Sequence, residues 1–294
     1  MSDAQSEKTP GLSADEEKEA SHNQPPRAAV LHEIIRSQGD QELERTLAAL
    51  WWSALAAGLT MGLSLMAMGL LYARLPEGSS AQVIASIGYS AGFLAVILAR
   101  QQLFTENTLT AVLPIMTTPT LANLGRLLRL WSVVLLGNLA GTLLVAWVML
   151  ELPIFDGKTD VAFLEVGRKV MKNDISQMFA KGIVSGWMIA TMVWMIPSME
   201  HAKIWIILMI TYLMALGDFT HIVVGSVEVS YLVWAGEETW SRFWLAFALP
   251  TLAGNIIGGS CIFALISHAQ VRSDSGKPPS QLLKKEKREQ RPGD

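Results

Sequence analysis

Two short polar phrases carry the side chains of this chain that could do chemistry. The sequence LFTEN occupies residues 103–107 and DFTH occupies residues 218–221, each inside an apolar stretch. Threonine donates and accepts hydrogen bonds, and histidine exchanges a proton near neutral pH. Aligning the shared Phe-Thr pair, at a separation of 115 residues, places Glu106 opposite His221. We expect the chemistry of this chain at these two positions.

Five ionisable side chains interrupt the apolar stretches. A charge at the bilayer centre costs roughly 2.5–3.5 kcal/mol on insertion scales, so it usually faces a cavity or a partner. The alternative for a lone histidine is a structural role, bonded to a carbonyl in a broken helix. Its position at a helix break favours a functional role for His221. The five side chains are Arg100, Glu106, Asp218, His221 and Glu228.

A second pair of matching segments indicates an internal duplication. GNLAG at residues 137–141 is matched by GNIIG at residues 254–258, 117 residues later. A duplicated membrane unit whose apolar segments are broken by polar residues at corresponding places is typical of a transport site. Glycines spaced by four, such as Gly58 and Gly62 or Gly137 and Gly141, permit close helix contact, and we interpret them as structural.

Composition predicts an all-α membrane protein. Hydrophobic residues make up 51% of the 294 and charged residues 17%, below the ~25% usual in soluble domains. A bilayer core needs about 20 apolar residues as helix. We expect six spans, with the second broken at residues 100–102 and the fifth at Gly217-Asp218. The spans are 47–72, 81–99 continuing as 103–116, 131–150, 182–196 with its flanks, 203–217 continuing as 222–234, and 243–267.

The residues outside the spans predict the domains and the orientation. We expect an acidic disordered tail at residues 1–27, an amphipathic helix at 28–46, a six-helix pore domain at 47–268 and a basic tail at 269–294. Lys and Arg gather in the basic tail and in the loops after spans two and four, so both termini are expected to be cytoplasmic. The basic tail either stays solvated or binds anionic lipid.

Other chemistry has no support in the sequence. Cys261 is the only cysteine, which excludes an intrachain disulfide and a cysteine metal cluster. Gly-rich phosphate loops, paired-histidine metal spacing and nucleophile elbows do not occur. We therefore expect no enzyme activity, no cofactor, no metal site and no nucleic-acid partner.

The residues also resemble a known family. LFT at 103–105, Gly182-Ile183 followed by MVW at 192–194, His221, and GNIIGG at 254–259 together resemble the formate/nitrite transporter family over residues 28–268. The resemblance implies an aquaporin-like fold of six helices in two inverted three-helix repeats, with helices two and five broken. It also implies a homopentamer in a bacterial inner membrane, with one pore per subunit that passes small monovalent anions, often with a proton.

The same resemblance assigns roles to individual positions. Thr105 matches the family's loop threonine, and His221 matches its central pore histidine. Bulky groups at the breaks and at two further positions match constriction residues. At two positions the family has asparagine and this chain has glycine. They are Gly186, in the expected helix four, and Gly225, four residues after the histidine. The expected pathway residues are Leu103, Phe104, Thr105, Glu106, Lys172 (with Lys169 as competitor), Ile189, Met214, Phe219, Thr220 and His221.

The function expected from these residues is passage of a small monovalent anion, such as formate or nitrite, or of its conjugate acid. Lys172 would concentrate the anion, and protonation near Thr105 and His221 would let it cross an apolar constriction. Glu106 departs from the family pattern, and an ionised carboxylate there would repel an anion. It could instead pair with Arg100 or protonated His221, or be protonated because of desolvation. Two alternatives stay open: a membrane scaffold or sensor derived from a pore, and a channel for a neutral solute.

Overall fold

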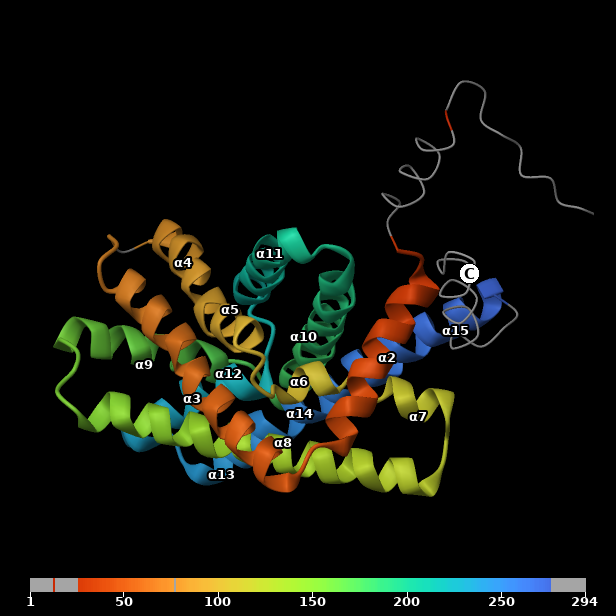
Figure 1. Cartoon of the computed structure of the whole chain (residues 1–294). Coiled ribbons are helices and arrows are strands. Elements are labelled where there is room, and N and C mark those ends of the chain that lie inside the picture. The colour runs from red at the N-terminus through yellow and green to blue at the C-terminus, as the bar shows by residue number, and fades with distance from the viewer. Residues whose placement is uncertain (1–12, 14–25, 77, 276–294) are drawn as a thin grey trace, which may run out of the picture.

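The computed structural model describes residue 13, residues 26–76 and residues 78–275, and the regular structure in this part of the chain is helical (Figure 1). Most of the acidic tail expected at residues 1–27 lies outside the described residues. The basic tail expected at 269–294 is described only as far as residue 275, where a helix that begins at Leu265 ends.

The described elements alternate long helices with short segments at the breaks. In chain order they are α2 (Ala28–Glu44), α3 (Leu47–Tyr72), α4 (Ser79–Ala85), η1 (Ser86–Tyr89), α5 (Ser90–Leu98), α6 (Phe104–Asn107), α7 (Leu113–Thr117), α8 (Leu121–Glu151), α9 (Gly157–Met171), α10 (Ile175–Met195), η2 (Ile196–Ser198), η3 (Glu200–Ala202), α11 (Lys203–Leu216), α12 (Ile222–Trp234), α13 (Trp240–Arg242), η4 (Phe243–Ala248), α14 (Leu249–Ile256), η5 (Ile257–Ala264) and α15 (Leu265–Ser275).

Five continuous helical stretches in the described residues are long and apolar enough to cross a membrane. The helices α11 and α12 are apolar but shorter, as the sequence predicts for a span in two pieces. Large apolar side chains face outward, with Leu121 88% exposed, Trp205 71% exposed and Trp52 66% exposed. Soluble monomers rarely expose contiguous apolar surface on this scale, so these side chains define a surface suited to lipid. The prediction of an all-helical membrane protein is confirmed.

The turns that precede α6 and α12 have the same backbone conformation and the same hydrogen bond. Arg100 and Asp218 are the non-glycine residues with positive φ in the described chain, at 53° and 50°. Each of these residues follows the end of a helix, α5 or α11. The N–H of the residue after it donates to the carbonyl five residues earlier, from Gln101 to Val96 and from Phe219 to Met214, both at 3.0 Å. A left-handed residue with this bond is the Schellman ending of a helix. It turns the backbone at the predicted break positions.

Two asparagines hold the chain beyond these turns. The Asn138 carbonyl accepts from the Phe104 N–H at 2.9 Å, while its amide donates to the carbonyls of Ala54 and Gln102, both at 2.8 Å. These bonds satisfy an N–H at the start of α6 that has no partner within the helix. The clamp therefore fixes α6 against α3 and α8.

The second asparagine repeats the arrangement at α12. The Asn255 carbonyl accepts from the Ile222 N–H at 2.9 Å, and its amide donates to the carbonyls of Gly182 at 2.9 Å and Thr220 at 3.1 Å. The sequence marked Asn138 and Asn255 as matching residues, and the structure supplies their role.

The equivalent contacts correct the alignment of the two phrases. Phe104 and Ile222 receive the same asparagine bond and are 118 residues apart, as are the left-handed Arg100 and Asp218. In this register His221 corresponds to Leu103. The placement of His221 opposite Glu106, taken from a separation of 115, is therefore wrong. The two Phe-Thr pairs do not occupy equivalent backbone positions, because the turn and the clamp define the register.

Glycines let the long helices touch backbone to backbone. A Cβ on Gly141 in α8 would lie 2.4 Å from the carbonyl oxygen of Leu55 in α3, and one on Gly58 would lie 2.2 Å from that of Asn138. Helix α10 contacts α14 and η5 in the same way, since a Cβ on Gly186 of α10 would lie 2.3 Å from the Asn255 oxygen and one on Gly258 of η5 would lie 2.0 Å from the Ile183 oxygen. The structural interpretation of the spaced glycines is confirmed.

Helix α2 is tied to the body of the molecule. Its apolar residues Leu31, Ile35 and Leu43 are buried, and Figure 1 shows it beside α15 and α7. His32 is fully buried, and its Nε2 lies 2.9 Å from Nδ1 of His268 in α15. The N-terminal and C-terminal helices thus share a buried polar contact.

Candidate functional site

The two predicted side chains Thr105 and His221 meet in the interior. Thr105 Oγ1 lies 2.7 Å from His221 Nε2, and the two residues are 0% and 1% exposed. His221 also caps α12, because its Nδ1 accepts the N–H groups of Val223 and Val224, each at 3.3 Å. An acceptor at Nδ1 places the proton of a neutral imidazole on Nε2. His221 therefore donates to the Thr105 hydroxyl, and that hydroxyl keeps its own proton for another acceptor.

Phe93 completes the surroundings of the histidine. Its ring lies edge-on to the His221 ring, with centroids 5.1 Å apart, and Phe93 is fully buried. Tyr89, four residues earlier, packs on Phe93 with centroids 5.4 Å apart. Neither residue was predicted, because an aromatic residue in an apolar helix carries no signal beyond that of packing.

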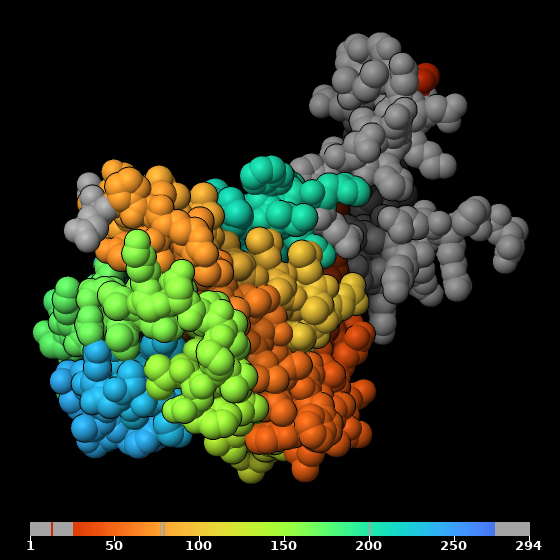
Figure 2. All heavy atoms as spheres, turned by 90° about the vertical axis from the view of Figure 1, so that its left-hand side faces the viewer, coloured from red at the N-terminus to blue at the C-terminus, as the bar shows by residue number. Residues whose placement is uncertain are grey.

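A cavity of about 230 Å³ connects this site to the surface. It runs between exposed Lys172 at the end of α9 and buried His221 at the start of α12. Seven other residues singled out in the sequence line it as well: Lys169, Met214, Asp218, Phe219, Thr220, Gly225 and Glu228. Figure 2 shows the face that bears α4 and α9, where segments coloured orange, green and blue come together from distant parts of the sequence.

The remaining predicted residues lie elsewhere. Leu103 and Ile189 are fully buried and do not line this cavity. Phe104 packs edge-on against Trp131, with centroids 5.7 Å apart. Thr105 is linked to the cavity through His221. A constriction role for Leu103, Phe104 and Ile189 stays a prediction.

An ion pair stands at the outer part of the cavity. Lys169 of α9 pairs with Asp218, the left-handed residue of the second break. The Arg168 guanidinium bonds Glu237, in the loop after α12, at 2.7 Å through Nε, and this contact lowers the pKa of the Glu237 carboxyl. Helix α9 is thereby fastened over the cavity. Lys172, in contrast, has no carboxylate within ion-pair distance among the described residues.

Glu106 makes no contact with His221 in the described structure. It is half-buried on α6 and makes no ion pair with Arg100 or His221 in the described structure. Arg100 itself is exposed. The pairing offered in the sequence interpretation is therefore wrong, since the threonine, not the acid, faces the imidazole.

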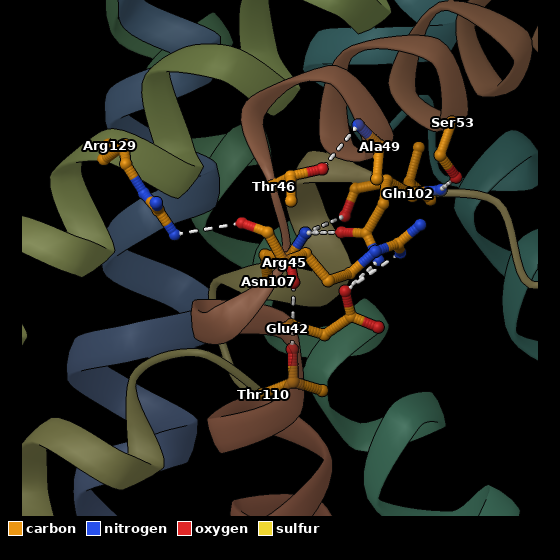
Figure 3. Close-up of polar contacts among 10 residues, drawn as sticks. Glu42, Arg45, Thr46, Ala49, Ser53, Gln102, Asn107, Thr110 and Arg129 are labelled. Atoms are coloured by element: carbon orange, nitrogen blue, oxygen red, sulfur yellow. Dashed lines mark hydrogen bonds and ion pairs between the residues drawn. The ribbon is translucent and has the colours of Figure 1, made fainter.

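A polar chain connects the first break to α2 (Figure 3). Glu42 accepts from the Gln102 amide at 2.6 Å, and the Gln102 carbonyl accepts from the Asn107 amide at 2.9 Å. Arg45 donates to Glu42 at 3.0 Å, and Thr110 donates to Asn107 at 3.2 Å. These bonds hold the segment around α6 on the side facing α2.

Comparison with known proteins agrees with this geometry. The formate/nitrite transporter family model matches residues 29–269. The chain is 56% identical over 265 residues to the inner membrane protein YfdC of Escherichia coli K12, covering 90% of this chain and 86% of that protein. It is 24% identical over 206 residues to the formate channel FocA of Haemophilus influenzae, covering 62% and 72%.

Solved structures give the same result for the fold. A pentameric formate channel with formate bound superposes with a TM-score of 0.63 at 18% identity, over 75% of this chain and 95% of that chain. An ion channel of the same family also gives 0.63, at 21% identity, over 81% and 94%. The chain belongs to the formate/nitrite transporter family, which consists of membrane transporters or channels and not of enzymes.

Proposed function

We propose that this protein moves a small monovalent anion, such as formate or nitrite, or its conjugate acid, across a bacterial inner membrane. One observation carries the proposal: the cavity that leads inward from Lys172 reaches His221, whose imidazole is hydrogen-bonded to the Thr105 hydroxyl behind it. Two hydrogen-bond donors or acceptors at the end of an apolar passage suit a small polar cargo. Family membership supports the same class of function.

We infer the aquaporin-like arrangement of two inverted three-helix repeats, with helices two and five broken. The equivalent Schellman endings and asparagine clamps support it, because matching contacts recur 117 or 118 residues apart. We also infer a homopentamer with one pore per subunit. The fold likeness to a pentameric formate channel supports that inference. Both termini are assigned to the cytoplasm from the Lys and Arg of the flanking loops.

The geometry indicates how an anion would be received. Lys172 attracts it at the cavity mouth, at long range and in a salt-dependent manner. Further in, Phe219, Met214 and Phe247 offer no charge compensation, and a bare anion loses hydration at high cost. At the end the Thr105 hydroxyl, which receives the His221 N–H, has its own proton available to a cargo oxygen. A neutral, protonated cargo therefore crosses more easily than the bare anion.

A flux assay on purified protein in liposomes tests this function. Formate, nitrite, hydrosulfide and a neutral solute such as glycerol are supplied in turn at pH 5 to 8, with protein-free liposomes as the control. We expect flux of one or more of the monovalent anions, rising as the pH falls. Flux of the neutral solute without pH dependence would favour a neutral-solute channel. An absence of any flux, together with a captured binding partner, would favour a scaffold or sensor.

A further inference from the structure

Glu228 is a buried acid on the wall of the cavity. It lies in α12, is 4% exposed and lines the same cavity as His221. The two residues are seven positions apart, which places them on one face of the helix about 10 Å apart along its axis. Gly225 lies between them on that face. A Cβ at Gly225 would lie 2.8 Å from the Phe247 ring and 3.9 Å from Glu228 Oε2, so the glycine makes room for that ring, and Gly225, Phe247 and Glu228 together line the cavity.

The Glu228 carboxyl has no hydrogen-bond or ion-pair partner among the described residues. A buried polar group of this kind is costly unless it has a role or contacts water. Asp218 takes up the nearest cation, Lys169, in its own ion pair. The titratable groups that share the cavity with Glu228 are Tyr72 of α3, Tyr89 of η1, Glu165, Lys169 and Lys172 from α9 and its end, Asp218, and His221.

His221 is a poor source of a transferable proton in this arrangement. Its Nδ1 accepts two backbone N–H groups, so the ring is neutral with one proton on Nε2. Release of that proton would leave an imidazolate. His221 therefore donates a hydrogen bond to Thr105 or to the cargo but does not give up its proton. Protonation of an anion in this passage needs another acid.

We propose that Glu228 is the proton relay of the passage and the residue that makes the cargo travel with a proton. The proposal rests on the transport function proposed above. In the step, the O–H bond of the neutral Glu228 carboxyl breaks and its proton binds an oxygen of the anion. The cargo leaves as the neutral acid and Glu228 becomes a carboxylate. A hydronium ion at the mouth then gives one proton to the Glu228 carboxylate and leaves as water, so one proton accompanies each anion.

The same carboxyl determines which form of the cargo is accepted. In its ionised form it repels an anion across a poorly hydrated cavity, where charge interactions are stronger than in water. An anion enters efficiently only while Glu228 is neutral. Both effects couple flux to proton supply from the cavity side.

The test compares wild type, Glu228→Gln and Glu228→Asp in proteoliposomes, with formate as the probe. Formate uptake and proton uptake are recorded together from pH 5 to 8, using a vesicle-trapped pH dye. Glu165→Gln is the matched control, because Glu165 is an exposed acid on the same cavity. We expect one proton per formate and a pH-dependent rate in wild type and in the control. Glu228→Gln should lower proton-coupled uptake at least ten-fold and flatten the pH profile, and Glu228→Asp should restore the coupling.

Two results separate the possible failures. If Glu228→Gln keeps the wild-type stoichiometry and pH profile, the relay is overturned while the transport function stands. If the wild type moves none of the anions, the transport function fails and the relay fails with it. Should Glu228→Gln not assemble, the Glu228→Asp profile decides, because a relay predicts a shifted pH midpoint and a purely packing role predicts none.

Discussion

The hydroxyl of Thr105 lies 2.7 Å from Nε2 of His221, although the two residues are separated by 116 positions in the chain. Each follows one of the two turns that interrupt the apolar helices. Because Nδ1 of the imidazole is occupied by the start of α12, the contact has a defined direction, from His221 to Thr105. It joins the two halves of the molecule at the buried end of the cavity.

Replacing Thr105 by Val should impair transport more than stability. Valine has a similar shape but cannot receive the His221 N–H or offer a proton to the cargo. We expect formate flux to fall about ten-fold, which corresponds to ~1.4 kcal/mol in the barrier. Thr142→Val is the control, since the Thr142 hydroxyl is also buried but bonds only to Leu139 in its own helix. Equal flux losses in both variants would contradict a specific role for Thr105.

Replacing either of the clamp asparagines, Asn138 or Asn255, should lower the stability of the fold. Asn138→Ala and Asn255→Ala each leave one N–H and two carbonyls without their partner. At about 1–3 kcal/mol per buried unsatisfied group, we expect a loss of roughly 3 kcal/mol or more in either variant. Thermal unfolding in detergent measures it, with Asn123→Ala as the control, because half-buried Asn123 loses only one side-chain bond, to the Thr118 carbonyl. A clamp variant as stable as that control would show that the turn holds without the clamp.

Helix packing predicts opposite outcomes for two glycines of α8. The Cβ of Gly141→Ala would collide with the α3 backbone at 2.4 Å, whereas Gly125 has nothing within 4 Å. We expect Gly141→Ala to lower the thermal midpoint and disrupt assembly. Gly125→Ala should be neutral or stabilising by up to about 1 kcal/mol, since alanine favours the helix. Comparable midpoints for the two variants would argue against direct α3–α8 backbone contact.

The attachment of α2 should weaken in acid. Burial, and secondarily the neighbouring His268, lowers the pKa of His32 from 6.5 to about 4, with Glu33 opposing and Arg36 reinforcing the shift. Between these pH values the unfolded chain binds the proton and the folded chain does not, so stability falls as the pH falls from about 7 to 4. The loss reaches up to ~3 kcal/mol. Unfolding midpoints across this range should decline less steeply in His32→Gln, and parallel slopes would exclude His32 as the cause.

The sequence located the site because its polar residues stand out against apolar surroundings. His221, Thr105 and the breaks were found from residue type alone, since an ionisable group or a charged turn in a membrane segment requires compensation. The resemblance to the family, in contrast, pointed to the two lysines at the end of α9, Lys169 and Lys172, and could not decide between them. In the structure both line the cavity, and only Lys169 is paired with Asp218.

The register of the two halves could not be read from side-chain similarity. Aligning the two Phe-Thr pairs gives a separation of 115 residues. The left-handed residues and the N–H groups bound by the asparagines are 118 residues apart. Backbone conformation, not residue identity, defines equivalence there. Phe93 was not predicted as a neighbour of His221 for a related reason, because an aromatic residue looks the same in the sequence whether it contacts a site or packs in a core.

Formate influx into proteoliposomes that carry His221→Asn tests the central claim most directly. Asparagine keeps a capping side chain at the start of α12 but removes the ring N–H that reaches Thr105. The account predicts intact assembly, formate flux reduced at least ten-fold relative to wild type at equal protein density, and an altered pH profile. Wild-type flux and pH dependence in His221→Asn would contradict it.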